Sequence, residues 1–115
     1  MRSQPLAACL ALVVLLPVGS ALAAQDSTPA DLVGDPSNGR TLVYTCQGCH
    51  GITGYKNAYP SFRIPRIGGQ SSEYLSQALH EYREGKRKHP TMQAQAQSFS
   101  EQEIADIAAY LSTVK

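Results

Sequence analysis

The residues with the clearest chemical potential lie in one short segment, Cys46-Gln47-Gly48-Cys49-His50. Two cysteines separated by two residues, with a histidine directly after the second, form the pattern of a c-type haem attachment site. In such a site each thiol adds to one vinyl group of the porphyrin, and the histidine binds the iron as its proximal ligand. The segment therefore predicts one covalently bound haem c, held by Cys46, Cys49 and His50.

Other chemistry of a Cys-x-x-Cys pair fits the surrounding sequence less well. A thioredoxin-like redox pair occurs in a βαβ context, and the neighbouring residues show no strand pattern. A zinc site needs a second pair of ligands at metal spacing, and His80 and His89 form no such pair. A structural disulfide is open as an alternative in an exported chain, although a two-residue gap makes it a weak cross-link.

The N-terminal residues 1–23 are typical of a signal peptide that is cleaved after export. Arg2 gives a positive start, residues 6–18 form an apolar run, and Ala21-Leu22-Ala23 resembles a cleavage site. The run is shorter than the roughly 20 residues of a membrane-spanning helix, so an uncleaved anchor is the less favoured alternative. Cleavage near Ala23 would remove Cys9 and leave the mature chain in the periplasm.

The mature chain is expected to consist of a polar linker (24–34) and one small domain (35–115). Its nine Lys and Arg residues, all those of the sequence except Arg2, balance its nine Asp and Glu residues. This balance does not indicate nucleic acid or a membrane surface as a partner. Because so short a chain buries only a modest core, a bound haem would contribute much of its stability.

Hydrophobic periodicity and capping signals predict an all-α domain with three main helices and long loops around the haem. The first helix begins at Asp35-Pro36 and leads into Cys46. The second covers residues 71–84, with an apolar face made of Tyr74, Leu75, Ala78, Leu79 and Tyr82. The third begins with a capping box from Ser100 to Glu103.

Two further features suggest how these helices are arranged. Gly39 falls on the apolar face of the first helix, where a glycine costs about 1 kcal/mol relative to alanine, so we expect the last helix to cross closely there. The Gly- and Pro-rich loop 51–70 is long enough to need a role, and wrapping the haem is one. Tyr55, Tyr59, Phe62, Ile64 and Ile67 would supply apolar surface for the haem.

The haem iron also needs a sixth ligand, and Met92 is the one methionine outside the signal segment. It lies in a polar stretch that we expect to be irregular, where a thioether has no obvious core to fill. A thioether ligand raises the haem potential and occupies the position that oxygen or a substrate would need. His89 and an open iron are the alternatives, whereas His80 lies on the polar face of its helix and is expected to be solvated.

These motifs resemble those of class I c-type cytochromes, in particular single-haem versions of a bacterial periplasmic family that often carries two such domains in tandem. The matching segments are Cys46-x-x-Cys49-His50-Gly51, residues 65–70, Tyr74-Leu75, Gly85-Lys86-Arg87, Met92 and residues 107–111. The resemblance implies an all-α fold, His50 and Met92 as axial ligands, and a proline carbonyl, best matched by Pro65, that hydrogen-bonds the proximal histidine. With one haem motif in the chain, transfer between two haems of one chain is excluded, and dimerisation is open.

The function expected from these features is periplasmic electron transfer by a haem that cycles between ferric and ferrous states, with no catalytic residues. The resemblance implies redox proteins as partners: a quinol-oxidising complex or dehydrogenase upstream, and an oxidase or reductase downstream. Lys86, Arg87 and Lys88, with Arg63 and Arg66, could form a basic rim for an acidic partner, although a solvated turn with haem propionate contacts is the simpler interpretation. The alternatives are a cytochrome subunit of a larger enzyme complex and, less favoured, a haem sensor or peroxidase-like protein.

Overall fold

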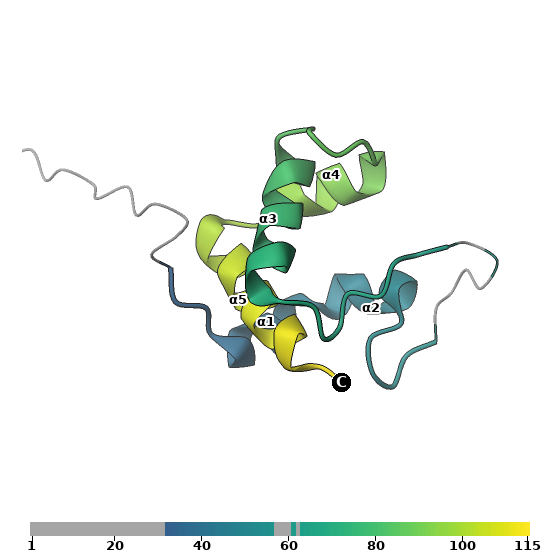
Figure 1. Ribbon diagram of the computed structural model, residues 1–115, viewed down its shortest axis with the longest axis vertical. Helices are drawn as coiled ribbons and strands as arrows, with labels where there is room; N and C mark the ends of the chain where they lie inside the picture. Colours follow the sequence, from purple (N-terminus) through teal and green to yellow (C-terminus); the bar gives the residue numbers. More distant parts are fainter. Residues whose placement is uncertain (1–31, 57–60, 62) are drawn as a thin grey trace, which may run out of the picture.

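The computed structural model describes residues 32–56, 61 and 63–115. The predicted signal peptide, most of the predicted linker, and Tyr59 and Phe62 of the loop lie outside these residues. The described part contains α1 (Pro36–Leu42), α2 (Tyr44–His50), α3 (Ser72–Arg83), α4 (Pro90–Gln97) and α5 (Glu101–Thr113), and no strand (Figure 1). The all-α prediction is confirmed, but five helices replace the expected three. Within the same residues, no helix is long and apolar enough to cross a membrane.

The first predicted helix is divided into α1 and α2 at Val43. Asp35 caps α1 as expected, its side chain accepting the amide of Ser37 at 2.8 Å. Val43 is fully buried and its ψ of 2° leaves the helical range, while its carbonyl accepts the amide of Cys46 at 2.9 Å. This tighter turn starts α2 as a separate segment, and Gly51 ends α2 in the left-handed conformation with φ 60°.

The stretch around Met92, expected to be irregular, is the helix α4. The His89 side chain caps it by accepting the amide of Met92 at 3.3 Å, and Pro90 occupies the first turn. Its remaining residues are mostly Ala and Gln, which favour helix without producing an apolar stripe. The expectation was therefore wrong because the segment has helix signals but no periodicity: Ala96 is its one buried residue.

Helix α5 runs through the middle of the domain and packs against α1 and α3, while α3 also packs against α4 (Figure 1). The predicted capping box at its start is confirmed: Ser100 and Glu103 each accept a hydrogen bond from the other's amide. The main core cluster consists of Val43, Ile52, Leu75, Ile107, Ala108 and Leu111. Two residues of the expected linker also contact α5, since Gln102 donates to the Val33 carbonyl at 2.9 Å and Gly34 lies against the backbone of Ala105.

The close crossing predicted at Gly39 is confirmed. A Cβ atom on Gly39 would lie 2.0 Å from the carbonyl oxygen of Asp106, a backbone atom of α5 that cannot move independently. Only glycine allows α1 and α5 to approach this closely. The close approach explains why Gly39 is present although it lowers the stability of α1.

A buried carboxylate joins α1 to α5 at the same crossing. The Asp106 side chain accepts hydrogen bonds from the amide of Asp35 at 2.7 Å, from Asn38 Nδ2 at 2.7 Å and from Gln102 Nε2 at 2.8 Å. Burial alone would raise the pKa of Asp106, but these three hydrogen bonds outweigh it and lower the pKa. The folded structure therefore stabilises the charged form of the Asp106 carboxyl group.

The Gly39 crossing predicts that Gly39→Ala destabilises the protein although alanine is the better helix former. Overpacking typically costs about 1–3 kcal/mol, more than the roughly 1 kcal/mol gained in helix propensity, and Gly39→Leu should cost more. The free energy of unfolding from denaturant titration measures this effect. Arg40→Ala, at an exposed position of the same helix, is the control; equal stability changes in the two variants would contradict the crossing.

The Asp106 network predicts a stability loss in acid. Because the folded pKa lies below the unfolded value of about 3.9, the contribution is complete above that value and is lost as the pH falls through the folded pKa. Asp106→Asn should lower the free energy of unfolding at pH 7 by about 1–3 kcal/mol and flatten its dependence on pH below about 4. Glu73→Gln, on the exposed first turn of α3, should have a smaller effect of at most about 1 kcal/mol, the usual contribution of a carboxylate near a helix N-terminus; an Asp106→Asn protein with the parental acid profile would contradict this assignment.

Candidate functional site

Helix α2 carries all three residues of the predicted attachment site. Cys46 and His50 are four residues apart and therefore lie one above the other on the helix surface, with Cys49 beside them. The three residues are half-buried, and both cysteines are free thiols. The structure thus brings the sequence-predicted thiols and imidazole together on one short helix.

The orientation of the His50 ring is set by a hydrogen bond. Its Nδ1 lies 2.8 Å from the carbonyl oxygen of Pro65. Because a carbonyl oxygen only accepts, Nδ1 must carry the proton and donate it, which leaves Nε2 with a free lone pair. In metal-binding histidines, a hydrogen bond from the ring nitrogen that does not bind the metal fixes the tautomer. The Pro65 carbonyl makes this bond here, at the position that the resemblance implied.

The segment that carries the Pro65 carbonyl is held by the C-terminal end of α5. The amide of Gly69 donates to the carbonyl of Leu111 at 2.9 Å. A Cβ atom on Gly68 would lie 3.0 Å from Val114 Cγ1, and one on Gly69 would lie 3.1 Å from the Val114 carbonyl. The backbone behind His50 therefore rests directly on α5 and the residue that caps it.

The electrostatics of Cys46 do not suit a nucleophilic redox thiol. Burial, the largest cause, raises the pKa of Cys46 above its usual value, and the nearby Cys49 raises it further against a lowering hydrogen bond with Thr45. A nucleophilic redox cysteine needs a depressed pKa. Among the residues described, no group of three His, Cys, Asp or Glu side chains is placed to hold a metal ion, so a zinc site has no support there either.

Met92 and the two other histidines occupy distinct positions. Met92 is half-buried on α4, and α2 and α4 extend to the same side of α3 and α5 (Figure 1). His89 uses Nδ1 to cap α4. His80 is not solvated as expected: its ring is half-buried and pairs with Glu101 of α5, because the face of α3 that appears polar packs against another helix.

The apolar side chains in the described part of the loop 51–70 differ in exposure. Ile67 packs against the core and Ile64 is half-buried, whereas Tyr55 is 56% exposed. The described residues of the loop have no helix or strand, as predicted. Their role in covering a haem stays a prediction.

Two of the three basic residues at positions 86–88, after α3, form ion pairs within the chain. Arg87 Nε lies 2.5 Å from Glu81, and its guanidinium group lies 5.5 Å from the ring centre of Tyr74, which explains why Tyr74 is exposed instead of buried. Lys86 forms a 2.5 Å ion pair with Glu84. These contacts balance two charges of the predicted basic rim.

Comparison with known proteins agrees with this geometry. A family model described as Cytochrome c matches residues 36–115. Cytochrome c4 of Pseudomonas aeruginosa is 36% identical over 86 residues, which cover 75% of this chain and 41% of the relative. Cytochrome c-554(548) of Halomonas halodenitrificans is 41% identical over 83 residues, covering 70% of this chain and 96% of the relative. The cytochrome subunit of sulfide dehydrogenase of Chlorobaculum tepidum is 35% identical over 78 residues, which cover 68% of this chain and 67% of the relative.

The chain belongs to the cytochrome c family, and it resembles one domain of the di-haem cytochromes c4. It spans less than half the length of cytochrome c4 but nearly the whole length of cytochrome c-554(548). The family implies covalently bound haem c, and Cys46 and Cys49 fit its attachment motif. The free Nε2 of His50 on the same helix fits an iron ligand. The relatives are named as cytochromes, in agreement with a protein that has no catalytic residues of its own.

The support behind His50 predicts that Gly69→Ala is destabilising. Gly69 has φ 79°, where an alanine costs about 1–2 kcal/mol, and the new Cβ would press on the Val114 carbonyl. Denaturant titration of the haem-bound protein should show a loss of this size. Gln70→Ala, which removes one exposed side-chain hydrogen bond at 3.3 Å, should change stability by less than about 0.5 kcal/mol; a loss in Gln70→Ala as large as in Gly69→Ala would contradict the assignment.

Proposed function

We propose that this chain is a periplasmic electron carrier with a single haem c. Cys46 and Cys49 bind the haem through two thioethers. His50 and Met92 are the axial ligands of an iron that cycles between ferric and ferrous states. The signal peptide predicted at residues 1–23 supports the periplasmic location.

The observation that carries this proposal is the hydrogen bond from His50 Nδ1 to the Pro65 carbonyl at 2.8 Å. It leaves Nε2 as the one ring nitrogen that can bind a metal, and it makes the imidazole a better donor to iron. Among the described residues, no group of three His, Cys, Asp or Glu side chains could hold a zinc ion. His50 lies one helical turn from Cys46, whose pKa is raised by burial. This arrangement suits covalent haem attachment better than thiol redox chemistry.

Met92 is the proposed sixth ligand because of its place and its chemistry. It is the one methionine among the described residues, it is half-buried, and it lies on a helix on the same side of α3 and α5 as α2. With a thioether bound, the iron is six-coordinate in both oxidation states, and this chain's residues have no proton or bond to transfer. The role of this chain's residues is to orient the two iron ligands, His50 and Met92, and to exclude water.

The proposed partners are redox proteins: a quinol-oxidising complex or dehydrogenase as donor, and an oxidase or reductase as acceptor. Docking should bury less than about 1,200 Å², as is usual for redox encounters. Since Lys86 and Arg87 are already paired with Glu84 and Glu81, we expect charge attraction from this region to be weak, as the interpretation of a solvated turn implies.

A second candidate function is supported by one of the relatives. The Chlorobaculum tepidum relative is named as the cytochrome subunit of sulfide dehydrogenase, and the match covers 67% of its length. This chain could therefore serve as the cytochrome subunit of a larger oxidoreductase. A stoichiometric partner that stays bound through purification from the native host would favour the subunit, and a protein purified alone would favour the free carrier.

The proposed ligand set predicts the spectra of Met92→Leu. The parent protein should retain haem through a denaturing wash and show the weak long-wavelength ferric band of iron–thioether coordination. Met92→Leu should retain the haem, lose this band completely, and bind carbon monoxide in the ferrous form, since leucine leaves the sixth position open.

Ala94→Leu is the matched control, because it places the same side chain at an exposed position of α4. It should keep the band and resist carbon monoxide. A band that persists in Met92→Leu would contradict Met92 as ligand, and a parent protein that loses its haem in the wash would contradict covalent attachment.

A further inference from the structure

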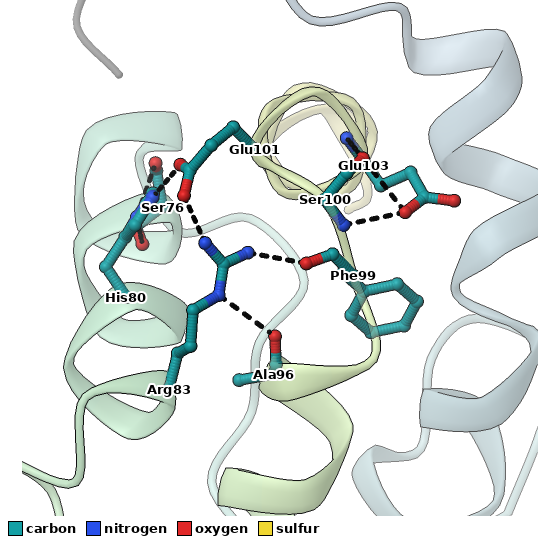
Figure 2. A network of polar contacts seen from close by, with 8 residues as sticks. All are labelled: Ser76, His80, Arg83, Ala96, Phe99, Ser100, Glu101 and Glu103. Atoms are coloured by element: carbon teal, nitrogen blue, oxygen red, sulfur yellow. Dashed lines mark hydrogen bonds and ion pairs between the residues drawn. The ribbon is translucent and has the colours of Figure 1, made fainter. Parts of the chain in front are cut away.

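Three charged side chains connect α3, α4 and α5 at a point that the proposed function does not use (Figure 2). His80 and Arg83 extend from the last two turns of α3, and both contact Glu101, the first residue of α5. We call these three residues the Glu101 clamp. Its side chains are half-buried, so the contacts are better shielded from water than surface ion pairs.

His80 is held by hydrogen bonds at both ring nitrogens. Its Nδ1 lies 2.7 Å from the Ser76 carbonyl and 3.5 Å from the Ser76 hydroxyl, and its Nε2 lies 2.5 Å from Glu101 Oε2. The other oxygen of Glu101 accepts from Arg83, which keeps the carboxylate ionised. The hydrogen bond from His80, followed by the attraction of both cations, lowers the pKa of Glu101 against the opposing effect of burial.

Arg83 extends this clamp to α4. Its Nε donates to the Ala96 carbonyl at 3.2 Å and its second terminal nitrogen donates to the Phe99 carbonyl at 2.6 Å. These carbonyls belong to the last turn of α4 and to the connection with α5, where a cation satisfies otherwise unpaired acceptors and opposes the negative end of the helix. The carboxylate of Glu101 holds the guanidinium group in place for this contact.

Ala96 and Met92 are one helical turn apart on the same face of α4. The carbonyl that Arg83 binds is therefore one turn beyond the proposed iron ligand, on a helix of only two turns. From this juxtaposition we propose that the Glu101 clamp is a positioning device for Met92, which holds α4 so that the thioether stays at the iron. This inference rests on the proposed role of Met92.

The groups around His80 come from α3 and α5. Glu101 faces His80 from α5, Arg83 and Ser76 face it from α3, and α4 has no titratable side chain between Pro90 and Gln97. Because hydroxide competes for the iron as the pH rises, a thioether that is held less firmly is displaced at a lower pH. Glu103 bonds to Ser100 and takes no part (Figure 2).

The test is the pH at which the ferric holoprotein loses half of its iron–thioether absorption band. In Glu101→Gln the hydrogen bonds to His80 and Arg83 lose their charge, so we expect this midpoint to fall by about one pH unit, a tenfold change in the equilibrium. Arg83→Gln should act in the same direction, and Arg83→Lys should recover part of the shift because a lysine can still cap the carbonyls. The control is Glu81→Gln, which breaks the ion pair with Arg87 on α3 without touching α4.

The outcomes separate this inference from the proposed function. A parent protein with bound haem but no such band at any pH would overturn both the role of Met92 and the clamp. A parental midpoint in Glu101→Gln, or an equal fall in Glu81→Gln, would overturn the clamp alone. If Glu101→Gln does not fold, His80→Gln replaces it: a lowered midpoint there supports the clamp, and a parental one overturns it.

Discussion

The contact on which the rest of this structure depends is the crossing of α1 and α5 at Gly39. The missing side chain lets α1 lie against the α5 backbone, and the buried Asp106 carboxylate binds the start of α1 from the same turn of α5. With α1 fixed in this way, the buried Val43 ends it and starts α2 in a set position. The attachment motif on α2 is therefore located by a contact that includes none of its own residues.

Helix α5 also supports both of the proposed iron ligands, one at each end. Its C-terminal end accepts the amide of Gly69 and so holds the backbone whose Pro65 carbonyl orients His50. Its N-terminal residue, Glu101, holds Arg83 against the last turn of α4. One rigid element of 13 residues thus links the two sides of the proposed haem site.

The sequence was sufficient for the features that depend on local chemistry. The Asp35 cap, the capping box at Ser100 and the close crossing at Gly39 are signalled by residue type and spacing, and the structure confirms all three. The attachment motif is signalled in the same way: the family implies haem c, and its binding by these particular residues stays a prediction. The resemblance to known cytochromes supplied the Pro65 carbonyl. By contrast, α4 was missed because its helix signals, Pro90 and a run of Ala and Gln, have no apolar period.

The errors at His80 and Tyr74 have a common physical cause. A helical wheel assigns a polar face to solvent, but the His80 face of α3 packs against α5, where Glu101 supplies the countercharge. Tyr74 is assigned to the core by the same wheel, yet the Arg87 guanidinium group stacks on its ring at the surface. In both cases the partner is a charged side chain distant in sequence, and periodicity carries no information about such a partner. A contact of this kind, between Arg83 and the Ala96 carbonyl, also holds α4, the helix that carries the proposed ligand Met92.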